Sequence, residues 1–226
     1  VDFITSSDKE YIASFKLGVK TDTGDITGKV IEEAKASLRS KEVKNAFLKF
    51  PKTYNQEVPI YSAVKINGKK LYEYARANKK VKLPKRKVEI KELELISFKG
   101  KTITFRALVS KGTYIRSLIN DICSKLNTIG TMTSLVRTKQ GGFLLDNSFT
   151  VKEVENSKYK IITIKELFKD YEQREIDGKF LTKIKNGALI DYDFEDYLVF
   201  IYKKDIIAIY QQYNKNPKLA KPLIIL

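Results

Sequence analysis

The feature that most constrains the fold of this chain is a strand pattern that continues directly into a helix pattern. Apolar and polar residues alternate from Val88 to Phe98 and from Ile103 to Val109, with Lys99-Gly100-Lys101 between them. This arrangement predicts a β-hairpin, because strand side chains alternate between two faces and short glycine-containing loops join antiparallel strands. The second strand then runs straight into Ser110 to Arg116, which spells SKGTYIR.

An apolar stripe at helical spacing begins just after Arg116. It comprises Leu118, Ile119, Ile122, Cys123 and Leu126, and Gly130 follows it. A helix is therefore expected to start at the end of SKGTYIR. Such a junction holds its side chains rigidly, so Tyr114 and Arg116 are candidates to project into a cleft. The alternative is that Tyr114 lies in the core and Arg116 pairs with surface carboxylates.

Four other segments have clear local patterns. The stretch Tyr11 to Val19 alternates as a half-buried strand does, and Thr21 to Gly28 supplies turn-forming residues. Helical spacing recurs from Val43 to Phe50, where Pro51 ends the segment. A second short helix is expected at Lys70 to Ala77.

The last part of the chain has the pattern of a small β-rich appendage. A helix is expected at Lys165 to Tyr171, with strands at Tyr197 to Tyr202 and Ile206 to Tyr210. Lys203-Lys204-Asp205 joins these two strands. We therefore expect one main domain and a smaller one, with a boundary near Gln173.

The charge balance favours a polyanionic partner. The sequence has 43 Lys and Arg against 27 Asp and Glu, a net charge of +16. Such an excess indicates nucleic acid or an acidic membrane surface as the partner. Apolar runs such as Tyr197 to Tyr202 are far shorter than the roughly 20 residues that span a bilayer. The pattern therefore predicts no membrane span.

Missing residue types narrow the chemistry. The sequence has no histidine and a single cysteine, Cys123. Serine–histidine and cysteine–histidine pairs are therefore excluded, and so are an internal disulfide and the usual zinc sites. Any catalysis must use Asp, Glu, Tyr, Lys or Arg. The lone cysteine fits a reducing cytoplasm.

Three segments are candidates for contact with RNA. Pro59 to Arg76 interleaves tyrosines, including Tyr61, with cations, including Lys65, a mixture that stacks on bases and neutralises phosphates. The alternative is a tyrosine-rich core under a solvated basic face. Lys79 to Lys87 is a denser basic run, which either contacts phosphates or only solubilises a loop. Leu135 to Phe143 offers two cations and paired glycines, or forms an ordinary turn.

Four segments occur in order along the chain. They are the Tyr11 strand with LGVKTDTGD (Leu17 to Asp25), QEVPIYSAVKINGKKLYEYAR (Gln56 to Arg76), SKGTYIR (Ser110 to Arg116) and LVRTKQGGF (Leu135 to Phe143). Together they resemble the TruB family, the bacterial tRNA pseudouridine synthases that modify the T-loop uridine. The chain departs from the family at Val58, where a proline is usual, and at Val136, where an arginine is usual.

The resemblance implies an α+β fold, with a mixed, largely antiparallel sheet flanked by helices and a small C-terminal domain similar to the RNA-binding PUA type. Residues 1–172 would form the catalytic domain and residues 173–226 the small one. The implied enzyme detaches uracil from its ribose, turns it and rejoins it through carbon, without cofactor or metal. Its partner would be tRNA, bound at the T-loop and elbow by a cytoplasmic monomer.

The resemblance also implies roles for individual residues. Tyr11 would stack on the flipped uracil and transfer a proton, because a phenol has both a π-face and an ionisable oxygen. Arg116 would hold the catalytic aspartate ionised through a bidentate grip. Asp25 would join the polar network of the site, Tyr114 would brace the pocket, and Leu135 would form an apolar wall. Further substrate contacts are expected from Lys65 and Tyr61.

The family's nucleophile is an aspartate in a Gly-x-Leu-Asp-Pro segment that precedes the Tyr11 strand. No such segment occurs in this sequence, and Asp2 and Asp8 lack its glycine, leucine and proline. We therefore expect an N-terminally truncated synthase, inactive as printed. The alternatives are a non-catalytic RNA-binding or RNA-chaperone protein that retains the fold, and a basic ribosome-associated protein with chance similarity.

Overall fold

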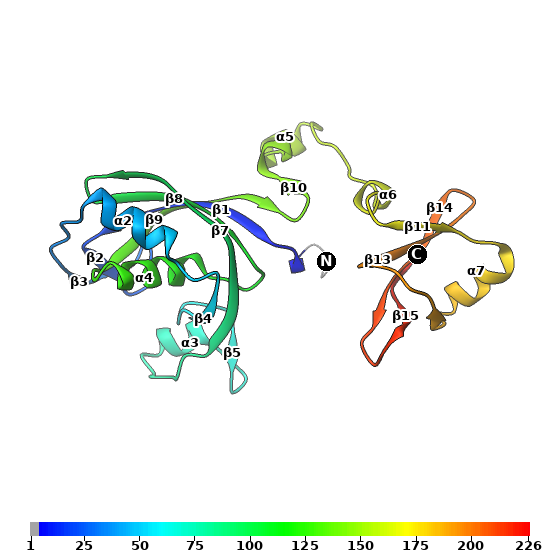
Figure 1. Cartoon of the computed structure of the whole chain (residues 1–226), viewed down its shortest axis with the longest axis horizontal. Helices are drawn as coiled ribbons and strands as arrows, with labels where there is room; N and C mark the ends of the chain where they lie inside the picture. The colour runs from blue at the N-terminus through cyan, green and yellow to red at the C-terminus, as the bar shows by residue number, and fades with distance from the viewer. Residues whose placement is uncertain (1–4) are drawn as a thin grey trace. The chain divides into compact units, whose positions relative to one another are not determined.

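The computed structural model describes residues 5–226, which divide into two compact units (Figure 1). The first unit ends at Ser148 and the second comprises Phe149–Leu226. Sequence patterns placed the domain boundary further along the chain, near Gln173. The division into a catalytic domain of residues 1–172 and a small domain of residues 173–226 stays a prediction. No helix in the described part of the chain is long and apolar enough to cross a membrane.

A six-stranded antiparallel sheet forms the centre of the first unit as described. In spatial order its strands are β10 (Phe143–Leu144), β9 (Gly130–Gln140), β1 (Lys9–Leu17), β8 (Thr102–Val109), β7 (Lys85–Lys99) and β4 (Thr53–Glu57). The predicted hairpin is confirmed as β7–β8, in which Lys99 pairs with Thr102. The central position of β1 gives Tyr11 a paired strand on each side.

Two helices, α2 (Ser40–Leu48) and α4 (Ile115–Lys125), pack against one face of this sheet (Figure 1). The predicted apolar stripe of α4 is buried against Phe15 and Phe105 of the sheet. The first unit also contains smaller elements. These are the paired strands β2 (Val19–Thr21) and β3 (Val30–Glu33), the paired strands β5 (Lys65–Ile66) and β6 (Lys69–Lys70), helix α3 (Leu71–Arg76) and the 3-10 turn η1 (Leu145–Asn147).

The second unit is built on a five-stranded sheet that is antiparallel except for the pair β11–β13. Its strands, in spatial order, are β11 (Glu172–Glu175), β13 (Tyr197–Tyr202), β14 (Asp205–Tyr213), β15 (Asn216–Ile225) and β12 (Ile190–Asp191); its helices are α5 (Val151–Glu155), α6 (Ile164–Leu167) and α7 (Gly178–Lys185). Ile184 of α7 and Phe200 of β13 lie in its core. The unit is β-rich as predicted, and its PUA-like character stays a proposal.

Two expectations need correction, although the α+β class with largely antiparallel sheets is confirmed. The helix predicted at Lys165 to Tyr171 is the single turn Ile164–Leu167, because Thr163 caps its start and the buried Phe168 follows its end. For Leu135 to Phe143, the alternative prediction was an ordinary turn, and this prediction is wrong for most of the segment. Strand β9 continues through Gln140, since it pairs with β1.

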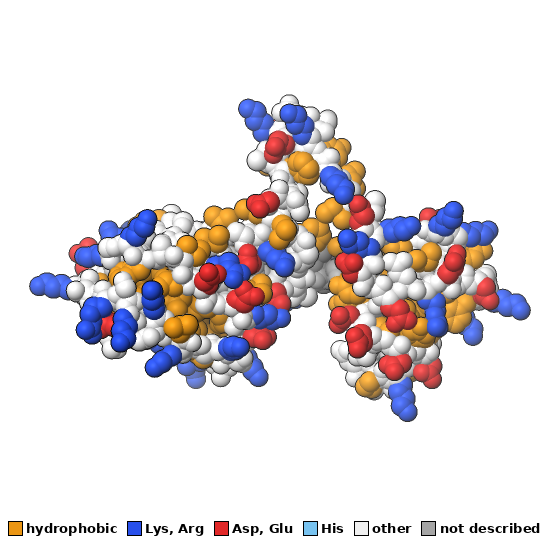
Figure 2. Space-filling view, turned by 45° about the horizontal axis from the view of Figure 1, so that its top comes forward, with side chains coloured by type: hydrophobic (Ala, Val, Ile, Leu, Met, Phe, Trp, Pro, Cys, Tyr) orange, Lys and Arg blue, Asp and Glu red, His pale blue; other side chains and the backbone are white. Residues whose placement is uncertain are grey.

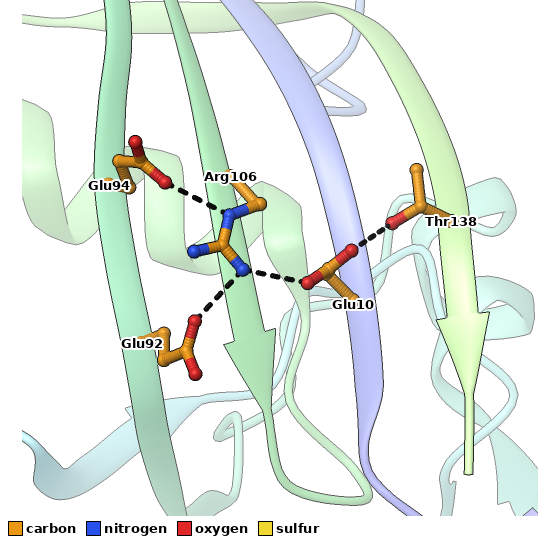
Figure 3. Close-up of polar contacts among 5 residues, drawn as sticks. All are labelled: Glu10, Glu92, Glu94, Arg106 and Thr138. Atoms are coloured by element: carbon orange, nitrogen blue, oxygen red, sulfur yellow. Dashed lines mark hydrogen bonds and ion pairs between the residues drawn. The ribbon is translucent and has the colours of Figure 1, made fainter. Parts of the chain in front are cut away.

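A polar network crosses the sheet face opposite the core and links four strands (Figure 3). Arg106 of β8 donates to Glu10 of β1 at 2.8 Å and to Glu94 of β7 at 3.0 Å, and it lies 2.9 Å from Glu92 of β7. Glu10 also accepts a 2.7 Å hydrogen bond from Thr138 of β9. Because Glu10 precedes Tyr11, these bonds fix the strand register beside Tyr11.

The Glu10→Gln substitution tests this network. The hydrogen bond from Thr138 and then those from Arg106 lower the pKa of Glu10. We expect the variant to lose about 1 kcal/mol of stability at pH 7, because a charge-assisted hydrogen bond is removed at a partly exposed site. A lowered pKa stabilises the fold above the carboxyl's ordinary pKa, about 4.3, and that contribution disappears as the pH falls.

Urea denaturation at pH 7 and at pH 3 measures the difference between the two proteins, which should shrink on acidification. Glu94→Gln is the matched control with a smaller expected effect, because the Glu94 side chain is 60% exposed and that of Glu10 is 21% exposed. A stability gap that widens at low pH would contradict this account.

Candidate functional site

Tyr11 lies on the face of β1 that is packed against the helices. It shares that face with Ala13 and Phe15, which are fully buried, and is itself partly buried against the same core. Its backbone pairs with Ala107 on one side and with Arg137 on the other. The ring therefore sits where the core ends, with part of its surface accessible.

Leu135 and Arg137 of β9 extend this face. Leu135 pairs with Ala13 and Arg137 with Tyr11, and directly opposite residues in antiparallel strands point to the same side. Leu135 remains 43% exposed. The structure thus brings the predicted residues Tyr11 and Leu135 onto one face and adds Arg137, which the sequence analysis had noted only as one of two cations.

Asp25 lies in the loop between β2 and β3. Its carboxylate accepts hydrogen bonds from the Thr27 amide at 3.0 Å, the Thr27 hydroxyl at 2.5 Å and the Thr23 hydroxyl at 3.1 Å. The bond from the Thr27 hydroxyl is the main cause of the lowered pKa of Asp25. The loop is anchored to β9, because the Ile26 amide donates to the Met132 carbonyl at 2.8 Å.

Arg116 lies in the first turn of α4 and ties two loops to that helix. Its guanidinium donates to the carbonyl oxygens of Thr23 and Tyr61, each at 2.8 Å. These bonds use two of the five N–H donors of a guanidinium. Beside it lies a cleft of about 190 Å³, whose lining includes Arg116, Tyr61 and Asp121. Neither sequence interpretation foresaw the bonds to the two carbonyl oxygens, since both paired Arg116 with a carboxylate.

Tyr114 is the N-cap residue of α4, and no side chain caps this end of the helix. Strand β4 holds it instead. The Tyr114 amide donates to Oε1 of Gln56 at 2.8 Å, and the Ser117 hydroxyl donates to the Glu57 carbonyl at 2.8 Å. Sequence reasoning missed β4 as an element, although Gln56 opens one of the four motif segments.

The basic segment Pro59 to Arg76 has features of both sequence interpretations, an RNA-contacting surface and a tyrosine-rich core under a solvated basic face. Tyr61 contacts Arg116 through its carbonyl, whereas the exposed Lys65 is not among the residues lining the adjacent cleft. The Tyr72 ring lies 5.3 Å from the Arg76 guanidinium and 5.5 Å from Nζ of Lys70. Two cations therefore flank the Tyr72 ring. Because Lys65 is exposed and does not line the cleft, it stays a candidate RNA contact away from the cleft.

The positive charge is concentrated within the first unit. Residues 65–87 contain ten Lys and Arg and one acidic residue, a net charge of +9. Residues 1–148 contain 29 cations and 15 acids, a net of +14, whereas residues 149–226 contain 14 and 12, a net of +2. Figure 2 shows cationic and acidic side chains interspersed on both units. Because its net charge is +14 against +2 for the second unit, the first unit attracts a polyanion more strongly.

Two aspartates, Asp2 and Asp8, precede Tyr11 in the sequence. Asp2 lies outside the described residues. Asp8 forms a 2.6 Å ion pair with Lys91 at the surface. Its carboxylate is thus engaged by a lysine of β7, and its carbonyl accepts a 3.0 Å hydrogen bond from the Gly141 amide.

Comparison with solved structures identifies the class of fold. An H/ACA ribonucleoprotein bound to a substrate RNA containing 2'-deoxyuridine matches with a TM-score of 0.65 and 15% identity, covering 100% of this chain and 67% of that chain. A Cbf5-Nop10-Gar1 complex also matches with a TM-score of 0.65, at 17% identity, covering 99% and 67%. This chain therefore shares the α+β fold of these two structures.

Sequence comparison gives the family. The profile described as TruB family pseudouridylate synthase (N terminal domain) matches residues 1–115. Relatives called tRNA pseudouridine synthase B are 40% identical in Mesoplasma florum, over 95% of this chain and 76% of the relative, and 37% identical in Bacillus cereus, over 99% and 79%. The chain belongs to the TruB family of pseudouridine synthases.

Arg116→Lys tests whether the guanidinium holds the two loops. An ammonium cannot bond two divergent carbonyls with the fixed geometry of a guanidinium. We expect roughly tenfold faster hydrogen exchange at the amides of Ile26 and Ser62, which lie in the two loops, because about 1 kcal/mol of local restraint is lost.

Hydrogen exchange followed by NMR reports both amides in one experiment. Arg76→Lys is the matched control, because Arg76 lies over the Tyr72 ring and bonds neither loop carbonyl in the described structure. Unchanged exchange at Ile26 and Ser62 in Arg116→Lys would show that the loops are held by other contacts.

Proposed function

We propose that this chain forms the uridine pocket and RNA-binding surface of a tRNA pseudouridine synthase that acts on the T-loop uridine. One arrangement carries the proposal. Tyr11 and Leu135 share a face of the sheet, and the helix packed on that face carries Arg116 in its first turn. An aromatic ring, an apolar wall and a fixed cation are the features that a pocket for an extruded base requires. The names of the relatives support tRNA as the substrate.

Tyr11 and Leu135 would receive the base. Extruding a uridine from its loop costs a few kcal/mol, and stacking on an aromatic ring offsets about 1–3 kcal/mol. The partly exposed ring of Tyr11 supplies that stacking surface, and its phenol oxygen can move the proton. Leu135 excludes water on the neighbouring strand. Both residues lie on paired strands, so their backbones are held in place before RNA binds.

Arg116 would orient the nucleophilic aspartate that the family uses. Its bonds to Thr23 and Tyr61 fix the plane of the guanidinium before a carboxylate arrives. The donors not used by these bonds can then hold a carboxylate in a planar, charge-assisted contact. Asp25 stabilises the adjoining loop, and Tyr114 braces the start of α4. Arg116 is therefore the residue on which the site depends.

The 226 residues printed here contain no Gly-x-Leu-Asp-Pro segment. We propose that a polypeptide of these residues alone binds the T-loop but does not isomerise its uridine. A second candidate function is that of a non-catalytic RNA-binding or RNA-chaperone protein, which the net charge of +9 over residues 65–87 supports. The two differ in what the site does, since only a synthase pocket needs to hold a uridine out of its stack.

A turnover assay tests the inactivity of these 226 residues. The release of tritium from 5-[³H]uridine in T-loop RNA measures isomerisation, because the hydrogen at carbon 5 is lost. We expect no release above background with this polypeptide, and tight binding of the same RNA. The synthase from Mesoplasma florum is the positive control. Turnover by this polypeptide at the rate of the control would refute the proposal.

A salt titration tests where the RNA is bound. Replacing Lys79, Lys80 and Lys82 by glutamine should lower the slope of log affinity against log salt by about 2, since each lost phosphate contact removes about 0.7–0.9. The matched control replaces Lys179, Lys183 and Lys185 of the nearly neutral second unit, and its slope should stay within about 0.5 of the parent chain. Equal losses in both variants would contradict a grip centred on residues 65–87.

A further inference from the structure

We propose that Asp121, Tyr54 and Gln56 form a positioning relay that fixes the strand-to-helix junction carrying Arg116; its effect on a bound base rests on the function proposed above. Tyr54 and Gln56 lie on β4, and Asp121 lies on α4. In this proposal the relay acts through the start of α4, which carries Arg116, and Asp121 also lines the cleft beside Arg116. The members of the relay are therefore positioning residues, not catalytic ones.

Three hydrogen bonds make up the relay. The Tyr54 hydroxyl donates to Oδ2 of Asp121 at 2.7 Å, and Nε2 of Gln56 donates to the Tyr54 oxygen at 2.8 Å. The other end of the Gln56 amide, Oε1, accepts from the Tyr114 amide at 2.8 Å. The relay thus runs from the middle of α4, through β4, and back to the start of α4.

The carboxylate of Asp121 sets the direction of every bond in the relay. Burial raises the pKa of the Asp121 carboxyl, and the hydrogen bond from Tyr54 opposes this shift by favouring the carboxylate, which can only accept. The phenol oxygen is then left to accept, which requires the NH₂ end of Gln56. The carbonyl end of Gln56 consequently faces the Tyr114 amide, which is the orientation that holds the junction.

Burial makes this direction costly to reverse. Gln56 is 1% exposed, so water cannot replace a partner that turns away. Burial, and then the hydrogen bond to Asp121, raises the pKa of the Tyr54 phenol, which therefore keeps its proton and remains a donor. A break at Gln56 leaves its buried amide unpaired inside the protein.

The junction needs this support because α4 has no side-chain cap at Tyr114. Gln56 takes the place of a cap by accepting from the Tyr114 amide. Arg116 follows two residues later, and its guanidinium must reach Thr23 and Tyr61 at once. A shift at the start of α4 would displace the guanidinium from one of these carbonyls. The relay therefore controls the geometry of Arg116.

Tyr54→Phe is the first test, made on the 226-residue chain with a T-loop hairpin that carries 2-aminopurine next to the loop uridine. We expect exchange of the Tyr114 amide to become about tenfold faster, and base capture, read by fluorescence, to weaken about tenfold. Affinity for the hairpin at fixed salt should change less than about twofold, because phosphate contacts dominate it. Tyr210→Phe is the matched control, since its hydroxyl bonds the Ala188 carbonyl in the second unit, outside the relay and outside residues 65–87.

Two substitutions of Asp121 separate the relay from a general loss of packing. Asp121→Asn keeps an acceptor oxygen for Tyr54 and should retain base capture within about threefold, whereas Asp121→Leu should behave as Tyr54→Phe does. Folded Tyr54→Phe and Asp121→Leu variants with unchanged Tyr114 exchange would overturn the relay. So would equal losses of base capture in Asp121→Asn and Asp121→Leu.

The two proposals fail in different ways. A parent chain that binds the hairpin without any fluorescence change would refute the proposed capture of the uridine. Exchange at the Tyr114 amide needs no RNA and would still decide the relay. Accelerated exchange in Tyr54→Phe and Asp121→Leu, but not in Asp121→Asn or Tyr210→Phe, would support it.

Discussion

The two hydrogen bonds from Arg116 to the carbonyls of Thr23 and Tyr61 join parts of the chain that are far apart in sequence. One carbonyl belongs to the Asp25 loop, the other to the start of the basic segment, and the guanidinium itself belongs to α4. A planar, permanently charged group is suited to this task, because its donors diverge at fixed angles. The Asp25 loop, which β9 also anchors through Met132, and the start of the basic segment at Tyr61 are therefore both tied to the start of α4.

The start of α4 is in turn held by the antiparallel sheet beneath it. Phe15 and Phe105 bury the apolar stripe of the helix, while the bonds of Arg106 on the opposite face keep β1 in register with its neighbours. Tyr11 thus sits on a rigid strand and Arg116 on a rigid helix end. Chemistry that depends on a well-placed base benefits from such preorganisation, since little order has to be gained on binding.

Local patterns in the sequence predicted a large part of this structure. The β7–β8 hairpin, the stripe of α4 and the β13–β14 hairpin follow from periodicity and turn residues, which act over a few neighbouring positions. The identity of Gln56 as a support for Tyr114 did not follow, because 58 residues separate the two partners. The extended path of β9 was missed for a similar reason: pairing with β1 decides it, and the glycines at its end suggested a turn.

A crystal structure of the 226-residue chain bound to a T-loop hairpin would test the central claim most directly. The account predicts that the loop uridine lies out of its stack, with its ring on Tyr11, its edge toward Leu135, and Arg116 still bonded to both loop carbonyls. A uridine that remains stacked within the loop, while the RNA contacts only residues 65–87, would contradict it. In that case the chain would be a basic RNA-binding protein on a synthase fold.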